Sequence, residues 1–208
     1  MSRSKGTQPT RDKILETALR LFSKNGYLGA TTKEIAKEAG IAEVTLFRHF
    51  PSKEKLFEEM INTYSFLPAL KELMPEIAMM SYEKALTVIA KRFLETLSSR
   101  KDLIQIMHSE MKRYPEKIHK IYHAFIDEIF KILASYFDEM QKRKILKDFD
   151  TEFGARAFLG MFFSYFNVHE MMMHKKYRHM DKDTTIKEFV KIFVNGTLKA
   201  VSRQEKTP

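Results

Sequence analysis

Two groups of histidines in the sequence have spacings that could serve metal binding or hydrolysis. His119 and His123 are four residues apart, so on one helix their imidazoles would share a face and could ligate one metal ion. No third ligand can be identified for them, and two solvated side chains explain the pair more simply. His169 and Glu170 begin a pattern similar to the zinc-protease helix, but His174 follows five positions after the first histidine rather than four. The histidines therefore provide neither a catalytic residue nor a metal site.

Other enzyme patterns are missing as well. The sequence has no phosphate-cradling glycine loop, no serine nucleophile elbow and no cysteine, which excludes thiolate chemistry and a disulfide framework. We expect no cofactor. No stretch approaches the roughly 18 uncharged apolar residues of a membrane span, and the N-terminal segment lacks a signal peptide's apolar stretch. A soluble, cytoplasmic protein that does not contact membranes is therefore expected.

The side chains between residues 43 and 50 are of the types that read DNA bases. In a helix over this range, Leu46 and Phe50 are four apart and point inward together. The opposite side carries Val44, Thr45, Phe47, Arg48 and His49. Arginine can pair bidentately with guanine, threonine can bond a base, and valine can contact a thymine methyl group. This outward face fits a DNA major groove.

The residues before this helix supply a second helix and a turn. Thr31 and Glu34 have the spacing of a capping box, so a helix is predicted from about Thr32. Gly40 ends this helix because glycine tolerates the left-handed backbone of a tight turn. The two helices and the turn make a helix-turn-helix pattern, although a small helical hairpin with a solvated face would produce a similar pattern.

Two further helices flank the helix-turn-helix. The first is predicted to start at a Thr10 cap and to end at Asn25-Gly26. The other starts at Ser52 and continues toward Tyr64, and its N-terminus with Lys53 and Lys55 should attract phosphate.

This region resembles the DNA-binding domain of TetR-family (TetR/AcrR) transcriptional regulators. Residues 11–32 read RDKILETALRLFSKNGYLGATT, similar to the family's first helix and its connection, and residues 45–57 read TLFRHFPSKEKLF, similar to its signature. The resemblance covers roughly the first 60 residues. It implies a homodimer that binds a palindromic operator in double-stranded DNA, together with a second helical domain that binds a small-molecule effector.

The resemblance also implies which residues contact DNA. Phosphate contacts are expected from Thr32, Phe47, His49 and Lys53, and base contacts from Lys33, Val44, Thr45 and Arg48. Position 47 departs from the family, which usually has tyrosine there, so a phenol hydroxyl is missing and this contact becomes packing only. Glu43 is unfavourable near phosphate unless it accepts a hydrogen bond from a cytosine amino group.

The net charge of +9 favours polyanionic partners, but the positive charge is spread along the chain. It is locally concentrated in residues 1–11, where Arg3, Lys5 and Arg11 occur with no acidic residue. Such an arm could reach phosphates or a minor groove, and composition fits a solvated tail equally well.

The rest of the chain is predicted to be helical, which makes the protein all-α. Long helical patterns cover residues 82–99, 101–113 and 115–144, and period-two alternation is absent. Pro68 and Pro75 interrupt the chain between residues 65 and 81. We therefore predict a DNA-binding domain at residues 1–65 and an effector-binding and dimerisation domain at residues 66–208.

The segment Ala155–Val168 is apolar on nearly every side, so it must be covered on every side. A second apolar helix near the C-terminus contains Ile186, Val190 and Phe193, with Gly196 allowing close approach. A two-fold dimer in which these helices form a four-helix bundle satisfies both, as the family resemblance also implies. A fully buried central helix in a monomer is the alternative.

Methionine and aromatic residues are abundant beyond residue 61 and suit an adaptable apolar pocket. Similar proteins use the corresponding helices to line the effector pocket, which implies as lining residues Met107, His108, Met111, Tyr114, Tyr122, Phe125, Phe158, Phe162 and Tyr165. The predicted function is a regulator, a repressor released by an apolar or amphipathic ligand. The alternatives are a helical enzyme or metal-binding protein, and an architectural DNA-binder of the same fold.

Overall fold

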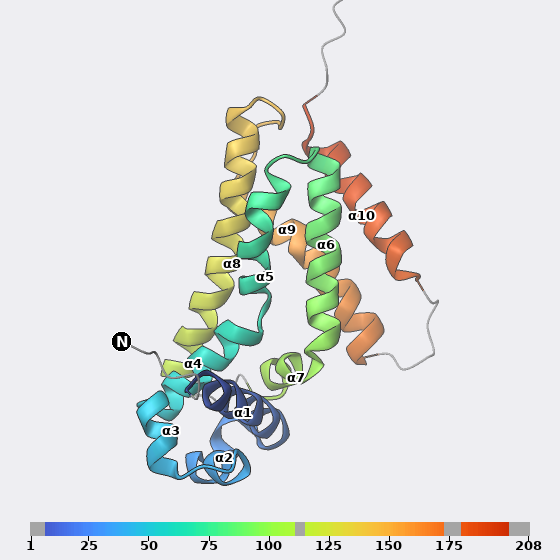
Figure 1. Ribbon diagram of the computed structural model, residues 1–208. Coiled ribbons are helices and arrows are strands. Elements are labelled where there is room, and N and C mark those ends of the chain that lie inside the picture. The colour runs from blue at the N-terminus through green and yellow to red at the C-terminus, as the bar shows by residue number, and fades with distance from the viewer. Residues whose placement is uncertain (1–6, 111–114, 173–179, 200–208) are drawn as a thin grey trace, which may run out of the picture. The chain divides into compact units, whose positions relative to one another are not determined.

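The computed structural model describes residues 7–110, 115–172 and 180–199, and these form helices with short connections (Figure 1). The helices are α1 (Thr7–Gly29), α2 (Thr32–Glu38), α3 (Glu43–His49), α4 (Lys53–Tyr64), α5 (Phe66–Ile77), α6 (Tyr82–Ser99), α7 (Lys101–Glu110), α8 (Glu116–Lys142), α9 (Thr151–Phe166), the π-helix η2 (Asn167–Met172) and α10 (Lys182–Thr197). An isolated antiparallel bridge joins Leu146 and Leu198. No strand occurs within the described ranges, which confirms the all-α prediction. No helix in them is both long enough and apolar enough to cross a bilayer.

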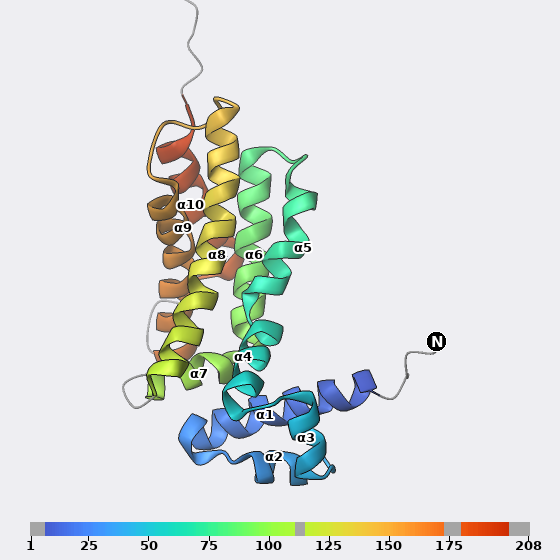
Figure 2. The ribbon, with the colours of Figure 1, turned by 90° about the vertical axis from the view of Figure 1, so that its left-hand side faces the viewer.

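The chain divides into two compact units. Unit 1 contains Met1–Ala69 and Thr96–Glu128, and unit 2 contains Leu70–Glu95 and Ile129–Pro208. Within unit 1, helix α7 packs on α1, as Figure 2 shows. The predicted domain boundary at residue 65 stays a prediction. The compact unit that contains the N-terminal helices also includes residues 96–128.

The core of unit 1 is built around α1, with α2 and α3 on the same side of that helix in both views (Figures 1 and 2). The apolar residues of α1 recur every three or four positions and so share one face of the helix, and this face is buried. The buried side chains include Ile14, Leu15, Phe22, Ile35, Leu46, Phe50, Leu56 and Phe57. Three aromatic rings meet in this core: Phe22, Tyr27 and Phe57, with ring centroids 5.1–5.7 Å apart. The helix-turn-helix therefore lies on a packed support.

Helix α1 begins earlier than the sequence indicates. It starts at Thr7, so the prediction of a Thr10 cap is wrong. Pro9 falls in the first turn, where its missing N–H leaves no intrahelical bond unmade. The predicted break at Gly26 is present, because this residue has a φ of 71° and a ψ of 170° inside the helical span.

Pro68 and Pro75 lie within helix α5 rather than in an interrupted segment. Pro68 is in the first turn, where its N–H has no helical partner in any case. Pro75 lies two residues before the end of α5, and it removes only the one hydrogen bond that its own N–H would donate to the Lys71 carbonyl. The two prolines do not interrupt α5, because the effect of a proline on a helix depends on where in the helix it lies.

The core of unit 2 is largely aromatic. Phe158 packs edge-on against Phe162 and Phe193, with ring centroids 5.2 and 5.1 Å away, and Phe193 also lies 5.6 Å from Phe137. These rings join α8, α9 and α10, of which α9 and α10 lie side by side (Figure 2). Burial of several phenylalanines, each worth roughly 1.5–3 kcal/mol, holds these helices together.

Candidate nucleic-acid interface

The helix-turn-helix is formed by α2 and α3. Thr31 caps α2, and its hydroxyl accepts a hydrogen bond from the Glu34 amide at 3.1 Å, as the capping-box spacing predicts. The Glu34 carboxylate instead accepts from the Asn25 side chain at 3.4 Å, which ties α2 to α1. Gly40 has a φ of 68°, so the turn needs a residue that tolerates the left-handed region.

Helix α3 has an inward and an outward face, as predicted. Leu46 is fully buried, and Phe50, which follows the helix as its C-cap, is 1 % exposed. On the outward face, Val44 is 75 % exposed and Phe47 is 41 % exposed. Arg48 is exposed beside them, while the side chains at positions 45 and 49 are half-buried.

The outward face of α3 presents groups suited to contact with DNA bases. Among the residues that the structure describes, none is recorded as a hydrogen-bond or ion-pair partner of Arg48. Its guanidinium therefore keeps its donors for a base edge, where the fork geometry of arginine matches guanine. Val44 is so exposed that it contributes little hydrophobic stabilisation within the protein, but its methyl groups can contact a thymine methyl group.

At the start of the helix-turn-helix, Thr32 and Glu43 contact each other. The Thr32 hydroxyl donates a hydrogen bond of 2.7 Å to the Glu43 carboxylate. This bond joins the first residue of α2 to the first residue of α3, and it occupies the only hydroxyl proton of Thr32. Glu43 is therefore engaged in joining the two helices. A hydroxyl–phosphate bond from Thr32 would first require breaking this contact.

The two predicted lysines differ in their surroundings. Lys33 is exposed on α2. Lys53 is half-buried at the first position of α4, and its ammonium lies 4.5 Å from the ring centroid of Tyr27 and 6.0 Å from that of Phe22. Ser52 caps the same helix by accepting from the Lys55 amide at 3.1 Å. The predicted α4 start is thus present, with one lysine held against aromatic rings.

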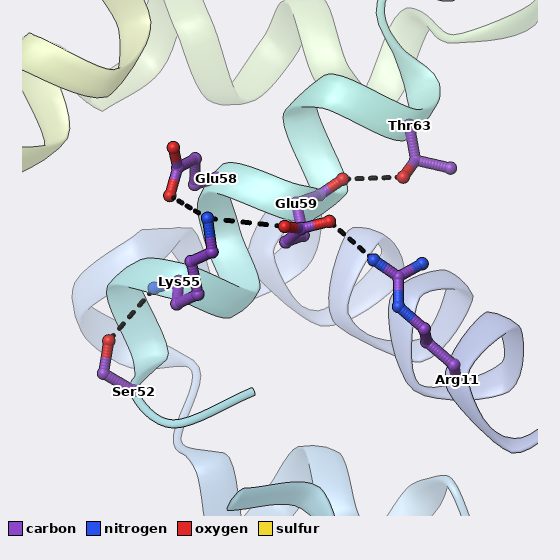
Figure 3. Close-up of polar contacts among 6 residues, drawn as sticks. All are labelled: Arg11, Ser52, Lys55, Glu58, Glu59 and Thr63. Carbon is purple, nitrogen blue, oxygen red and sulfur yellow. Dashed lines mark hydrogen bonds and ion pairs between the residues drawn. The ribbon is translucent and has the colours of Figure 1, made fainter. Parts of the chain in front are cut away.

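Lys55 does not extend freely toward a phosphate. Its ammonium contacts Glu58 at 2.9 Å and Glu59 at 3.4 Å, and Glu59 in turn accepts a 2.5 Å hydrogen bond from Arg11 (Figure 3). Neighbouring carboxylates raise the pKa of Lys55, mainly through its hydrogen bond to Glu58. Arg11 also lies 5.3 Å from the Phe50 ring. These two basic residues therefore link α1, α4 and the end of α3, and such part-exposed pairs contribute up to about 1 kcal/mol each.

Arg11 belongs to the predicted basic arm but lies within α1. Arg3 and Lys5 fall outside the described residues. The guanidinium of Arg11 already binds Glu59, so the prediction of a basic arm that contacts DNA now applies to Arg3 and Lys5.

Comparison with known proteins shows what this arrangement is. The family model for bacterial regulatory proteins of the tetR family matches residues 14–60, which include α2 and α3. A second model, the C-terminal domain of AefR-like transcriptional repressors, matches residues 84–196. The chain belongs to the TetR family of transcriptional regulators.

This TetR-family regulator is similar to two curated regulators in sequence and to one solved structure in fold. The HTH-type transcriptional regulator YvkB of Bacillus subtilis is 28 % identical over 91 % of this chain and 97 % of its own. IcaR, the negative regulator of the biofilm operon icaADBC in Staphylococcus aureus, is 26 % identical over 67 % of this chain and 75 % of its own. FadR from Bacillus subtilis, solved with stearoyl-CoA, has a TM-score of 0.70 and 16 % identity, covering 89 % of this chain and 98 % of its own. The FadR likeness, at this identity, concerns the fold.

Family membership decides against the alternative of a helical enzyme, because TetR-family proteins are transcriptional regulators. Of the histidines considered for chemistry, His119 is half-buried and His123 is exposed on α8. His174 lies outside the described residues. Within the described ranges, His, Cys, Asp and Glu side chains form no group of three or more that could hold a metal ion.

The structure describes only part of the predicted effector-binding set. Outside the described residues lie Met111 and Tyr114, and the side chains of Met107 and His108. Tyr122 and Phe125 are buried in unit 1, with their rings edge-on at 5.1 Å. These two rings therefore pack against each other in the core of unit 1, and their role as pocket-lining residues stays a prediction.

The remaining predicted lining residues lie in unit 2. Phe158 and Phe162 are fully buried, and Tyr165 is half-buried, with its hydroxyl donating to the Met180 carbonyl at 2.9 Å. At the start of η2, the Asn167 side-chain oxygen is buried and has no hydrogen-bond partner among the residues that the structure describes. Asn167 is not among the predicted lining residues. Its unmet acceptor, in a π-helical turn of a kind common at functional sites, marks it as a ligand-binding candidate.

The residues that sequence reasoning missed at the DNA end are those that hold others in place. The Tyr27 ring contacts the Lys53 ammonium, and the Glu43 carboxylate accepts a hydrogen bond from Thr32. Each pair joins residues at least 11 positions apart, on different helices. Helical periodicity does not relate such positions, so no local pattern predicts these contacts.

Proposed function

We propose that this protein is a homodimeric repressor that binds a palindromic operator and leaves it when a small apolar or amphipathic ligand binds. The observation that carries the DNA part is the outward face of α3, where exposed Val44 and Arg48 stand on a helix whose other face is fully buried. The repressor assignment is supported by the AefR-like repressor model and by IcaR, a negative regulator.

The proposed contacts divide into those that bind any DNA and those that select a sequence. Lys33, Val44, Thr45 and Arg48 would contact bases. Phosphates would be contacted by Thr32, Phe47, His49 and Lys53. The Thr32–Glu43 bond favours a contact through the α2 N-terminus for Thr32, since its hydroxyl proton is in use. Phe47, exposed and without a hydroxyl, would contribute apolar packing against the DNA backbone.

Dimer formation is supported by the exposed side of α9 and α10. Helix α9 exposes Ala157, Gly160 and Ser164, which recur every three or four residues and therefore form one stripe of small side chains. On α10, Ile192 is 62 % exposed and Gly196 is exposed nearby. A Cβ atom added at either glycine would meet nothing within 4 Å. Small and apolar residues with open space in front of them suit a close four-helix contact with a second copy.

The operator is tested by selecting binding sequences from random duplexes and footprinting the winner. We expect salt-sensitive binding to an inverted repeat whose half-site centres are about one helical turn, or a multiple of it, apart, because two-fold protein symmetry must match the duplex. A single unrepeated half-site, together with sedimentation as a monomer at micromolar concentration, would contradict the dimeric proposal. Protection spread over any DNA would favour an architectural binder instead.

The ligand is proposed from the apolar residues of unit 2 and from the binding partner of a relative. FadR was solved with stearoyl-CoA, which combines an acyl chain with a polar group. Buried phenylalanines of α9 suit a chain of that kind, and the buried acceptor of Asn167 suits a donor on the ligand. We therefore propose an amphipathic acyl ligand as the effector class, with Phe158, Phe162, Tyr165 and Asn167 of unit 2 as candidate contacts.

The path from ligand to DNA is proposed to use the helices of unit 1 that contact the helix-turn-helix support. Helix α4 starts beside α3 and ends at Tyr64, where the Arg100 guanidinium lies 4.6 Å from the Tyr64 ring. Arg100 directly precedes α7, which packs on α1. A ligand that moves α7 would therefore act on both α1 and the end of α4.

Coupling between the two sites must be reciprocal. If the ligand lowers the protein's affinity for operator by some factor, operator must lower the protein's affinity for the ligand by the same factor. This factor is typically about 5- to 150-fold. Thermal-shift screening of acyl-CoA thioesters identifies a ligand, and titration with and without operator measures the factor. An affinity that operator leaves unchanged would show that this ligand does not control DNA binding.

A further inference from the structure

The ammonium of Lys53, a half-buried side chain at the start of α4, lies against two aromatic rings. Its ammonium is 4.5 Å from the Tyr27 ring centroid and 6.0 Å from that of Phe22. Both distances fall within the range of a cation–π interaction.

The Tyr27 ring is itself fixed from three directions. Gly26, with a φ of 71°, reverses the chain so that the Tyr27 ring stacks on Phe22 with centroids 5.7 Å apart. The Phe57 ring packs edge-on against it at 5.1 Å. Its hydroxyl bonds to the Glu54 carboxylate, on the residue next to Lys53. A side chain that is 4 % exposed and held in this way provides a rigid support.

The titration behaviour of these groups agrees with that geometry. Burial, with a smaller effect of Glu54, raises the pKa of Tyr27 to about 12, so the phenol stays protonated and donates its hydrogen bond. Burial lowers the pKa of Lys53, and Glu54 opposes this by favouring the ammonium. The cation is thus partly stripped of water before any partner arrives.

We infer that Tyr27 is a positioning residue for DNA binding: its ring holds the Lys53 ammonium at the start of α4, where the lysine and the helix N-terminus bind one DNA phosphate together. The inference rests on the proposed function, in which Lys53 contacts phosphate. A lysine side chain normally loses much rotational freedom when it is immobilised by a ligand. Here the rings impose that restriction in the free protein, so less freedom is lost when phosphate binds. Tyr27 itself touches no DNA.

A double-mutant cycle with Tyr27→Leu and Lys53→Met tests this inference in the full-length protein. Binding to the selected operator and to random duplex is measured for all four proteins. In the Lys53 background, Tyr27→Leu should weaken both by about three- to tenfold, because a phosphate contact does not depend on sequence. In the Lys53→Met background, it should change neither. Equal losses in both backgrounds would show a purely structural role and overturn the inference.

Two further variants separate the ring from its surroundings. Tyr27→Phe keeps the ring and removes the bond to Glu54, so it should retain affinity within about twofold. Phe57→Leu loosens the same aromatic cluster without removing the Tyr27 ring. It should lose less affinity than Tyr27→Leu when circular dichroism shows both to be equally folded. Equal losses for these two variants would attribute the effect to the core.

A readout independent of DNA is the nuclear magnetic resonance signal of the Lys53 ammonium. In the free protein this signal should be shifted by the ring currents, and Tyr27→Leu should reduce that shift, leaving the smaller effect of the more distant Phe22 ring, while Tyr27→Phe keeps it. If Lys53→Met leaves DNA binding unchanged, the inference is wrong even though the protein binds its operator. If the wild-type protein binds no duplex, the proposed function fails, and the inference fails with it.

Discussion

Arg48→Ala is expected to weaken binding to the operator by about 1–3 kcal/mol, roughly 5- to 150-fold, while binding to random duplex stays nearly unchanged. The reason is the position of Arg48, which is exposed on the outward face of α3. A guanidinium on that face can pair bidentately with one guanine, and its loss should relax the preference at a single base pair. Competition binding against operators altered at each position measures both effects.

The matched control for Arg48→Ala is Lys53→Ala. Lys53 lies at the start of α4 rather than on the outward face of α3. Its removal should weaken all sequences alike and reduce the slope of log affinity against log salt by about one. If Arg48→Ala weakened operator and random DNA to the same extent, Arg48 would be a phosphate contact and base selection would lie elsewhere on α3.

Gly160→Trp is expected to dissociate the dimer and lower operator affinity by about 100-fold or more. Gly160 lies on the exposed stripe of α9, and an added Cβ atom meets nothing within 4 Å, so a side chain there starts from open space rather than against the protomer's own core. It would, however, separate the helices of two protomers that approach closely at that stripe. A dimer gains about 10²- to 10⁴-fold from binding two half-sites at once, and a monomer loses this gain. Sedimentation and operator titration measure the two effects.

Lys131→Trp, at an exposed position on α8, controls for the effect of a large aromatic side chain at a surface. It should leave both the dimer and operator binding intact. Circular dichroism should show the same helical content and unfolding temperature for both variants at matched protomer concentration, apart from the stability lost with the dimer. A dimeric Gly160→Trp protein with normal affinity would place the dimer contact on a different surface.

Local sequence patterns were sufficient for the helix-turn-helix itself. A cap, a periodic apolar stripe and a left-handed glycine involve residues within one helical turn, so they specify α2, the turn at Gly40 and α3 without reference to the rest of the protein. The same holds for α6, whose predicted and observed limits coincide at residues 82 and 99. For this reason the family and the outward face of α3 could be inferred from sequence.

Proline was less informative, because its effect depends on where it falls in a helix. Pro9 lies in the first turn of α1, and α5 contains two prolines near its ends. Pro9 and Pro68 lie where a helical N–H has no partner in any case, whereas Pro75 removes the one hydrogen bond that its own N–H would make. The sequence shows a proline, but the structure decides which turn contains it.

Only the tertiary structure decided which side chains hold the DNA-contacting residues in place. Lys53 lies on the ring of Tyr27, Thr32 bonds Glu43, and Arg11 pairs with Glu59. The partners are 11 to 48 positions apart, on different helices, and they meet because α1 packs against α4 and α2 packs against α3. Helical periodicity constrains neighbours on one helix and leaves the rotation and spacing of separate helices undetermined. The residues that could contact DNA were therefore predictable from the sequence. The side chains that hold those residues in place were not, because they are brought together by packing between helices.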